Sequence, residues 1–323
     1  MNKKKIKNVL VVLGGTSGER AVSLESGKAC IKALKKKGYK VSTFDPKIKN
    51  YNLINKKNVD VIFNALHGKE GEDGVAQIYF EYLKIPYTHS GVISSFNAMD
   101  KIISKEIFIK NKIRTPKFFS IKKHDFSDRL FQKKLRNNKL NFPIVAKPVN
   151  EGSSLGVKVY KRKNILFKSI SRLFKKYDQL IFEEYIGGQE IQVAVAKGKS
   201  IGAIELIPKR LFYDYKAKYT KKANTKHLMP ARLSKKKYNE VLNIAKKTHK
   251  VLNCKGVTRA DFKFYKNKFF LLEINTQPGM TGLSLVPEIA NYKRISFENL
   301  VKKILLNASL NRWKNHYLDQ LYL

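Results

Sequence analysis

RADFKFYKNKFFLLEINTQPGMTGLS, residues 259–284, is the stretch with the strongest structural signal in this chain. Polar and apolar residues alternate with a period of two on either side of the short polar segment 266–268, which predicts two antiparallel strands and a tight turn. The predicted buried face consists of aromatic and aliphatic residues: Phe262, Phe264, Phe270, Leu272 and Ile274. The opposite face would carry four polar side chains: Arg259, Asp261, Glu273 and Asn275.

The length of the turn decides which residues face each other. A three-residue turn pairs Tyr265 with Phe269, so that Asp261 falls opposite Glu273. Side chains in such a pair have Cβ atoms about 4.5–5.5 Å apart, a distance at which two carboxylates repel. A divalent cation removes the repulsion, and Mg²⁺ is typically held by carboxylates and substrate phosphates. A two-residue turn would put the two carboxylates on opposite faces, and a solvent-facing charged hairpin is an equally good interpretation of this stretch alone.

Composition indicates a folded, strongly basic protein. The chain has 323 residues, is 43% hydrophobic and carries a formal net charge of +41. Such a charge is typical of nucleic-acid-binding proteins. The lysines are nevertheless spread in twos and threes, with no basic block and no nucleic-acid-binding motif, which favours solvated basic faces that attract anionic substrates.

The sequence predicts a cytoplasmic protein. Its two cysteines, Cys30 and Cys254, lie in no metal or redox motif. The apolar run 9–13 after the first lysines is too short for a signal peptide core. No run approaches the ~20 apolar residues of a spanning helix.

Two loops near the N-terminus follow predicted strands. GGTSGER comes after the strand at 8–13, and its carboxylate Glu19 favours an ammonium group over a phosphate. ALHGKEGEDG, residues 65–74, follows the strand at 59–64 at the carboxyl end, where open α/β sheets bind ligands. His67 in this loop is either a site residue or a structural histidine.

Residues 143–160, PIVAKPVNEGSSLGVKVY, read as a strand ending at Lys147, a small-residue loop and a second strand. Small residues let backbone N–H groups approach a phosphate closely. The loop lacks the Walker A pattern, and a glycine-rich hairpin without a ligand is the alternative. The carboxylates Glu183 and Glu190 stand out in this basic chain and suit an adenine amino group or ribose hydroxyls. The sequence of residues 207–227 has no clear period and predicts a long loop, of the kind that often closes over an active site as a lid.

Taken together, the motifs resemble the ATP-grasp superfamily and, within it, the D-alanine–D-alanine ligase family. The resemblance rests on GGTSGERAVSLESG, HGKEGEDG, MDK, AKPVNEGSSLGV, FEEYIGGQE, FYDYKAKY, TRADF and LEINTQPGMTGLSLVP, in this order. It implies an α/β fold of three domains, with the nucleotide held between two α+β domains. The expected domains are an N-terminal substrate-binding domain, 1–98, a central ATP-grasp domain, 99–184, and a C-terminal ATP-grasp domain, 185–323.

The resemblance implies the residues that bind ATP: Lys101, Lys147, Gly152, Ser154, Glu183, Tyr185, Glu190 and Lys218. Lys101, Lys147 and Lys218 are expected at the phosphates, under the loop 152–156. Glu183 and Tyr185 are expected at the adenine, and Glu190 at the ribose. Two Mg²⁺ or Mn²⁺ ions are implied at Asp261, Glu273 and Asn275.

The resemblance also implies the catalytic residues: Glu19, His67, Ser153, Tyr219, Arg259, Gly279 and Ser284. Glu19, with His67 nearby, would hold the first D-alanine's ammonium group. Arg259 and the Gly279 N–H would stabilise the oxyanion. Arg259 and Ser284 would bind the second carboxylate. Glu19, Ser153 and Tyr219 correspond to a hydrogen-bonded trio in the family.

The implied activity is ATP-dependent formation of D-alanyl-D-alanine through D-alanyl phosphate, for peptidoglycan precursors. Tyr219 favours dipeptide formation over use of D-lactate. The implied partners are two D-alanines and ATP in a homodimer, with no nucleic acid and no membrane.

Two other activities stay open at this point. One is an ATP-grasp carboxylate–amine ligase with another acceptor. The other, of a different class, is a basic nucleic-acid-binding protein on a decayed ligase fold. The tail 307–323 has no assigned role, and packing on the C-terminal domain is its simplest interpretation.

Overall fold

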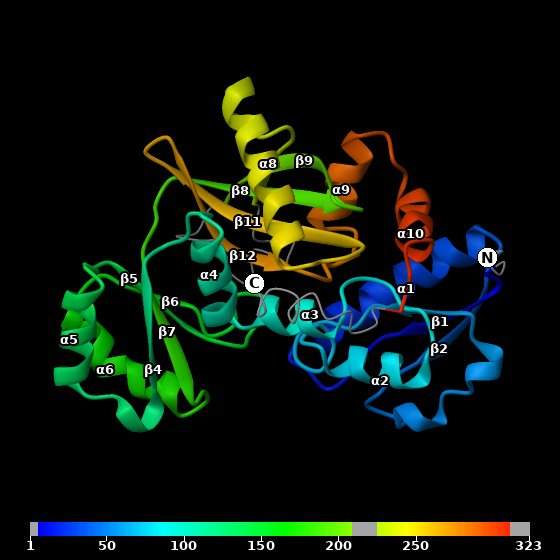
Figure 1. Ribbon diagram of the computed structural model, residues 1–323, viewed down its shortest axis with the longest axis horizontal. Helices are drawn as coiled ribbons and strands as arrows, with labels where there is room; N and C mark the ends of the chain where they lie inside the picture. Colours follow the sequence, from blue (N-terminus) through cyan, green and yellow to red (C-terminus); the bar gives the residue numbers. More distant parts are fainter. Residues whose placement is uncertain (1–5, 209–224, 311–323) are drawn as a thin grey trace, which may run out of the picture.

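The computed structural model describes residues 6–208 and 225–310. Within these residues the strands form three sheets, each contributed by a separate part of the chain. Figure 1 shows the sheet of residues 118–184 at the left, the N-terminal sheet at the right and the third sheet above and between them. No helix in this part of the chain has the length and apolarity that crossing a bilayer requires.

The N-terminal sheet is parallel, with strand order β2-β1-β3, and is buried on both faces. Val9 and Val11 of β1 pack in the same core as Leu34 of α1, whereas Leu10 and Val12 pack with Phe80 of α2. Cover on both faces explains why β1 is a continuous apolar run. The elements are β1 (Asn8–Val12), α1 (Arg20–Lys36), β2 (Lys40–Phe44), the 3₁₀ helices η1 (Tyr51–Leu53) and η2 (Lys56–Asn58), β3 (Val61–Asn64) and α2 (Val75–Leu83).

The helices α3 (Val92–Met99) and α4 (Lys101–Lys110) follow and pack with the third sheet. Asp100 caps α4, because its Oδ1 accepts from the backbone N–H groups of Ile102 and Ile103 at 2.9 and 3.0 Å. This cap begins the helix at Lys101. Lys101 and Lys105 are therefore four residues apart on one helical face.

The central sheet is antiparallel, with strand order β4-β7-β5-β6. Its core is aromatic: the rings of Phe119, Phe131 and Phe182 lie 5.2–5.5 Å apart. The elements are β4 (Phe118–Lys122), η3 (Lys123–Asp125), α5 (Asp128–Asn137), β5 (Ile144–Pro148), β6 (Lys158–Tyr160), α6 (Lys163–Phe174) and β7 (Gln179–Glu184).

The third sheet is antiparallel, with strand order β10-β9-β8-β11-β12. Val193 and Val195 of β8 pack with α8, whereas Ala194 packs with α9, α10 and α1. This second core joins the third sheet to the N-terminal one. The elements are β8 (Gln189–Ala196), β9 (Lys199–Ile207), β10 (Lys226–Leu228), α8 (Lys235–Val251), β11 (Val257–Tyr265), β12 (Lys268–Asn275), α9 (Leu285–Tyr292) and α10 (Phe297–Leu305).

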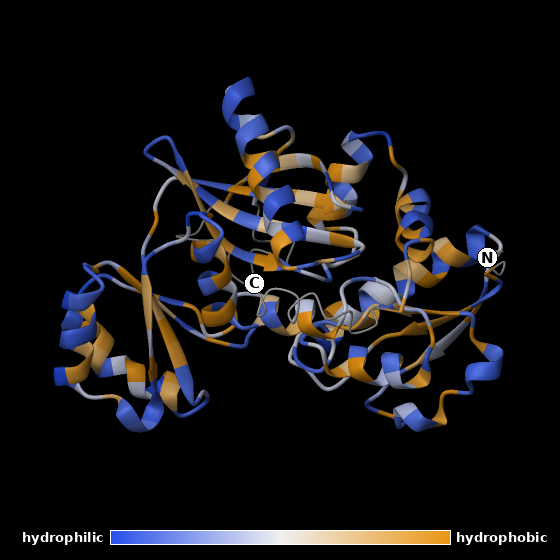
Figure 2. Cartoon of the chain, in the orientation of Figure 1, coloured by the Kyte–Doolittle hydropathy of each residue, from blue (hydrophilic) through white to orange (hydrophobic). Residues whose placement is uncertain are grey.

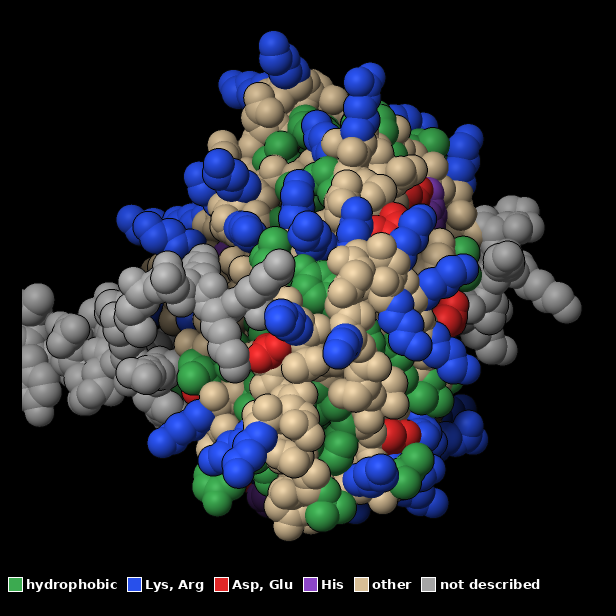
Figure 3. All heavy atoms as spheres, turned by 90° about the vertical axis from the view of Figure 1, so that its right-hand side faces the viewer, with side chains coloured by type: hydrophobic (Ala, Val, Ile, Leu, Met, Phe, Trp, Pro, Cys, Tyr) green, Lys and Arg blue, Asp and Glu red, His purple; other side chains and the backbone are tan. Residues whose placement is uncertain are grey.

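Surface polarity follows this layering. Figure 2 shows apolar residues along the strands and hydrophilic residues on the outer turns of α5 and α8. Figure 3 shows Lys and Arg side chains scattered over one whole face of the molecule, without a single block.

The β11–β12 hairpin corrects the predicted turn. The turn has two residues, Lys266 and Asn267, both with positive φ, and Tyr265 pairs with Lys268. The predicted pairing of Tyr265 with Phe269 is therefore wrong. Asp261 still pairs with Glu273, and Arg259 with Asn275, because the register shifts between Asp261 and Phe262.

A β-bulge at Leu272 explains this result. Phe262 pairs with Leu271 and Asp261 with Glu273, so Leu272 is the extra residue on β12. The buried residues of β12 are consequently Phe269, Leu271 and Ile274. The prediction that Phe270 and Leu272 fill the core was wrong, because two-residue alternation counted from a three-residue turn assigns them to the wrong face.

Candidate active site

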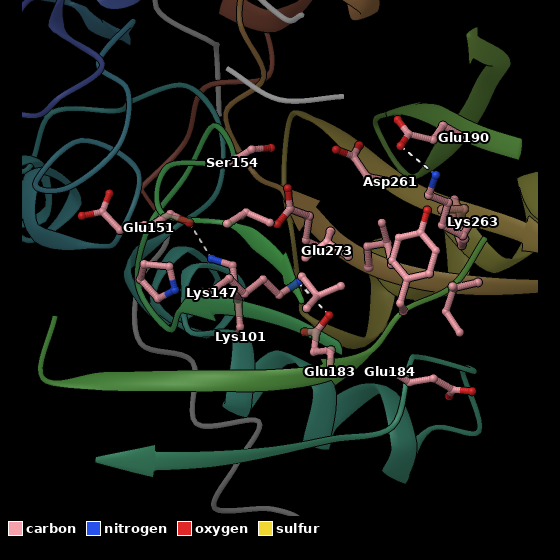
Figure 4. A pocket seen from close by; sticks show the side chains of 18 of the residues that line it. Lys101, Lys147, Glu151, Ser154, Glu183, Glu184, Glu190, Asp261, Lys263 and Glu273 are labelled. Carbon is pink, nitrogen blue, oxygen red and sulfur yellow. Dashed lines mark hydrogen bonds and ion pairs between the residues drawn. The ribbon is translucent and has the colours of Figure 1, made fainter. Parts of the chain in front are cut away.

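A cavity lies between the central and third sheets. Strands β5 and β7 line one side, and β8, β11 and β12 line the other. Its apolar walls include Val145, Val159, Ile186, Phe262 and Leu272. Figure 4 shows lysines and carboxylates from both sheets pointing into the same space. A mainly apolar cleft with a few converging charges is the usual form of a small-molecule site.

Glu183 at the end of β7 holds two ammonium groups. Its Oε2 is 2.9 Å from Lys147 Nζ, and its Oε1 is 3.1 Å from Lys105 Nζ. Burial alone would raise the pKa of Glu183, but the two lysines outweigh burial and lower it. Lys105 was missed at the sequence level. Its position four residues after Lys101 on a helix was the available signal.

Lys101 lies next to the start of the small-residue loop. Its Nζ donates to the backbone carbonyl oxygens of Val149 and Glu151, the first at 3.3 Å. Burial lowers the pKa of Lys101. The loop that follows needs unusual backbone angles, since Ser153, Ser154 and Gly156 all have positive φ. Lys101 therefore holds the residues just before this loop, at the edge of the cavity.

The far end of the cavity holds Glu190 on β8 and Tyr185 after β7. Glu190 Oε1 is 2.8 Å from Lys263 Nζ, and this ion pair is visible in Figure 4. Lys263 is a second residue that sequence analysis missed. It lies on the predicted polar face of its strand, but its partner Glu190 on another strand was not predicted. Ser154 lines the cavity as well.

The predicted metal ligands lie on two adjacent strands. Asp261 and Glu273 line the large cavity, and Glu273 and Asn275 line a smaller one beside it. Arg259 binds both oxygens of Asp261, with Nε to Oδ1 at 2.7 Å and an Nη2 to Oδ2 at 2.8 Å. Asn275 Oδ1 accepts from the Gln277 N–H at 2.8 Å.

These donors fit a hard cation. Two carboxylates and an amide oxygen are the ligand types that Mg²⁺ prefers. Among the residues described, no group of three His, Cys, Asp or Glu side chains could hold a metal ion. Any ion here would thus depend on oxygens from the amide, from water or from a bound phosphate.

Glu19 joins the N-terminal sheet to the small-residue loop. It precedes α1 and is 4% exposed, and the Ser153 hydroxyl donates to its Oε2. A Cβ added at Gly152 would collide with Glu19 Oε1. A side chain at position 152 would therefore displace the Glu19 carboxylate. The structure therefore brings together two predicted site residues that are 134 positions apart.

Glu72 is a further buried carboxylate at this point, and sequence analysis did not single it out. Burial, followed by the charge of Glu19, raises the pKa of Glu72 well above 4.5. Its Oε1 accepts from the Gly68 N–H at 2.9 Å. His67 Nδ1 is 4.0 Å from Glu72 Oε2, and burial lowers the pKa of His67 to about 4. A neutral imidazole is thus the prevailing form at neutral pH.

The turn after β12 contains Gly279 and Ser284. Ser284 Oγ accepts from the Thr281 N–H at 2.9 Å, and it is the residue before α9. Ser26 on α1 ties this turn to His67: its Oγ accepts from the Met280 N–H at 3.1 Å and lies 3.2 Å from His67 Nε2. Lys218 and Tyr219 lie outside the described residues.

The family model described as D-ala D-ala ligase C-terminus matches residues 107–306, and that described as D-ala D-ala ligase N-terminus matches residues 44–90. The chain is 54% identical over 306 residues to a D-alanine–D-alanine ligase of Pelagibacter ubique (strain HTCC1062), covering 95% of this chain and 99% of the relative.

Two solved structures of a D-alanine–D-alanine ligase from Bacillus anthracis have the same fold. One has a TM-score of 0.83 and 33% identity, covering 93% of this chain and 97% of the other. The second, described as complexed with ATP, has a TM-score of 0.79 and 31% identity, covering 94% and 97%.

Proposed function

The chain belongs to the D-alanine–D-alanine ligase family, and we infer from this membership that it joins two D-alanines to D-alanyl-D-alanine, using ATP, for peptidoglycan precursors. One structural observation carries the proposal. The Ser153–Glu19 hydrogen bond connects the loop suited to phosphates with the carboxylate suited to the substrate ammonium group. The two reactants of the first step would thus meet at one place.

We propose that ATP occupies the large cavity. Its adenine would lie near Tyr185, and the adenine amino group would donate a hydrogen bond to Glu183. The ribose hydroxyls would reach Glu190. The phosphates would extend to Lys101, Lys147 and the loop that carries Gly152 and Ser154. Support comes from the shared cavity and from the similar fold of a relative described in complex with ATP. The proposed third phosphate lysine, Lys218, lies outside the described residues.

The first step transfers the γ-phosphoryl group. A carboxylate oxygen of the first D-alanine attacks the γ-phosphorus, the bond to the bridging oxygen breaks, and ADP leaves. Negative charge crowds at the phosphoryl group, so lysines are the chemically appropriate residues. We propose that Glu19 holds the ammonium group of this D-alanine, and that neutral His67 packs beside it.

The second step forms the amide bond. The neutral amine of the second D-alanine attacks the acyl phosphate carbonyl, its nitrogen loses a proton, and phosphate leaves when the tetrahedral intermediate collapses. Arg259 and the Gly279 N–H are proposed to stabilise the oxyanion, and Arg259 and Ser284 to bind the second carboxylate. One oxyanion donor contributes roughly 3–4 kcal/mol to transition-state stabilisation in other enzymes. Tyr219, proposed to complete the trio with Ser153 and Glu19, lies outside the described residues.

Asp261, Glu273 and Asn275 are proposed to hold two Mg²⁺ or Mn²⁺ ions. When bound, the ions would supply positive charge for the transferring phosphoryl group. The fit of hard oxygen donors supports this assignment, and so does the opposition of Asp261 to Glu273. Arg259, which now binds Asp261, supplies the positive charge that this carboxylate requires when buried.

We propose a homodimer that forms through α2 and α3. Four large apolar side chains on these neighbouring helices are 43–80% exposed: Ile78, Tyr82, Ile93 and Phe96. Exposed apolar side chains on two helices that contact each other support an interaction surface here. A cytoplasmic location is also proposed, and it is supported by the two free, buried cysteines.

The domains are proposed to be 1–98, 99–184 and 185–323. The three sheets each fall inside one of these ranges. The packing of α4 on the third sheet shows that residues 101–110 also contact the C-terminal range.

Phosphate release from ATP and Mg²⁺ tests the function directly. The purified protein is incubated with D-alanine, with L-alanine, with D-alanine plus D-lactate, or with no acceptor. D-alanine-dependent release with equal amounts of dipeptide is expected. No release with D-alanine would contradict the proposal, and release with another acceptor would indicate a related ligase. Strongly salt-dependent binding to duplex DNA, in a protein without this activity, would favour the nucleic-acid alternative.

A further inference from the structure

Lys105 on α4 is a fully buried lysine beside the nucleotide cavity, at 0% exposed side chain. Its Nζ is 3.1 Å from Glu183 Oε1 and donates to Thr115 Oγ1 at 2.6 Å. Burial lowers the pKa of Lys105 to about 8, and the Glu183 carboxylate limits this decrease. The ammonium group thus stays charged at neutral pH. Burying a charge is costly unless it is paired, so this lysine needs a specific explanation.

The two lysines that bind Glu183 occupy different positions. Lys147 lines the cavity and is labelled in Figure 4 with its contact to Glu183. Lys105 is not among the cavity-lining residues and approaches Glu183 from α4. A bound nucleotide can therefore reach Lys147 but not Lys105.

This difference matters once nucleotide enters. Lys147 is proposed to contact phosphate, yet in the present structure its ammonium group binds the carboxylate proposed for adenine. If Lys147 turns to phosphate, Glu183 loses one of its two counter-charges while 2% exposed. Without a second positive charge, the carboxylate would take up a proton or turn away from the base.

Lys105 is also tied to the strand that carries the metal ligands. Thr115 Oγ1, which accepts from Lys105, donates to the Leu271 carbonyl at 2.8 Å. The Leu271 N–H donates to the Arg114 carbonyl, also at 2.8 Å. Leu271 is the residue directly before the bulge that precedes Glu273. Contacts to β12 therefore hold Lys105 in place, and Lys105 in turn holds Glu183.

We propose that Lys105 is a positioning residue that keeps Glu183 ionised and aimed at the adenine amino group while Lys147 moves from Glu183 to the nucleotide phosphates. This rests on the proposed nucleotide site. Lys105 itself touches neither nucleotide nor D-alanine. It determines the affinity for ATP and the preference for adenine.

Lys105→Met tests the proposal, because methionine has a similar length and no charge. We expect the KM for ATP to rise about 10- to 100-fold, the range for loss of a hydrogen bond to a charged group. kcat should change less than threefold, and the KM for D-alanine should stay within twofold. The preference for ATP over ITP should also shrink, because hypoxanthine presents a carbonyl oxygen where adenine presents an amino group. Loss of packing alone would not change base preference.

Three further proteins make the result decisive. Lys110→Met, on the same helix but exposed, should behave like the unchanged protein. Lys105→Arg keeps the charge and should retain a preference for ATP over ITP. If Lys105→Met fails to fold, as circular dichroism would show, Thr115→Val takes its place. It removes one contact of Lys105 and should produce a smaller change in the same direction.

An unchanged KM for ATP and an unchanged ATP-to-ITP ratio in Lys105→Met, or in Thr115→Val if that variant must replace it, would overturn the proposal. Calorimetric titration with ADP separates this outcome from failure of the proposed ligase function. A chain that binds ADP but joins no D-alanine would contradict the function, and the effect of Lys105→Met on ADP affinity would still decide the role of Lys105.

Discussion

Asp261 and Glu273 lie opposite each other on β11 and β12, although the turn between these strands has only two residues. Unbroken alternation from that turn would pair Asp261 with Leu272 and send Glu273 to the other face. The bulge at Leu272 absorbs one residue and restores the pairing. Both carboxylates, together with Leu272, consequently line the cavity proposed to hold ATP.

Glu273→Gln should weaken the dependence on Mg²⁺. An amide has one oxygen donor and no charge, so it balances the cation less well than a carboxylate does. We expect kcat/KM for ATP to fall roughly 100-fold and the half-saturating Mg²⁺ concentration to rise, since metal stabilisation of the phosphoryl group is worth several kcal/mol. Phosphate release measured across a Mg²⁺ titration checks this. Glu240→Gln, on the outer helix α8, is the matched control; an identical Mg²⁺ curve for both variants would argue against a metal role of Glu273.

Arg259→Lys should slow amide formation more than acyl phosphate formation. Arg259 binds Asp261 through two nitrogens, which a lysine ammonium cannot reproduce. We expect kcat for dipeptide synthesis to fall roughly 100-fold, as for loss of an oxyanion donor. Trapping of the acyl phosphate with hydroxylamine should fall much less. Arg232→Lys, which alters a similar pair with Glu205 outside the catalytic machinery, is the control. Equal loss in both assays would place the effect in the first step instead.

His89→Asn should reduce the loss of stability at acid pH. His89 is 4% exposed, and burial, followed by the charge of His67, lowers its pKa to about 3. The unfolded chain takes up this proton below pH 6.5 and the folded chain does not, so stability falls as pH decreases from 6.5 toward 3. Asparagine tolerates the positive φ of 69° at this position.

Between pH 7 and pH 5, His89 accounts for about 2 kcal/mol of the decrease in the free energy of unfolding. Urea unfolding at both pH values measures this difference, which should be smaller by that amount in His89→Asn. The exposed His124→Asn serves as a control. An undiminished pH effect in His89→Asn would show that another group causes the acid sensitivity.

Tyr82→Glu should dissociate the proposed dimer. Tyr82 is 80% exposed near the end of α2 and belongs to the proposed α2–α3 surface. A carboxylate there would lose hydration upon association without gaining a partner. Light scattering after size-exclusion chromatography should give half the mass at micromolar protein. Ile165→Glu, at a 49% exposed residue on α6 beside the central sheet, should leave the mass unchanged. A protein that is already monomeric would contradict the dimer itself.

Local patterns were sufficient for several parts of this protein. The apolar run of β1, the hairpin of β11 and β12, and the loop after Lys147 follow from periodicity and small residues within a few positions. The ordered motifs also predicted the family, which the comparisons confirmed.

Local patterns were insufficient where a turn or a bulge changed the strand alternation by one residue. The two-residue turn placed Phe270 and Leu272 outside the core, and the bulge then restored the pairing of Asp261 with Glu273, because alternation carries no record of an inserted residue. Lys105, Lys263 and Glu72 each acquire their role from a partner on another element or from burial. Their neighbours in sequence do not reveal that partner.

The sequence by itself determined which chemical groups are present and which short segments carry them: carboxylates on a hairpin, small residues after a strand and lysines on a helix. Only the tertiary structure decided that Glu19 meets Ser153, that Glu183 has a lysine on each oxygen, and that Asp261 faces Glu273. The physical reason is the distance along the chain over which each interaction acts. Backbone preference acts over a few residues, whereas burial and charge pairing depend on which distant segments the folded chain brings within a few ångströms.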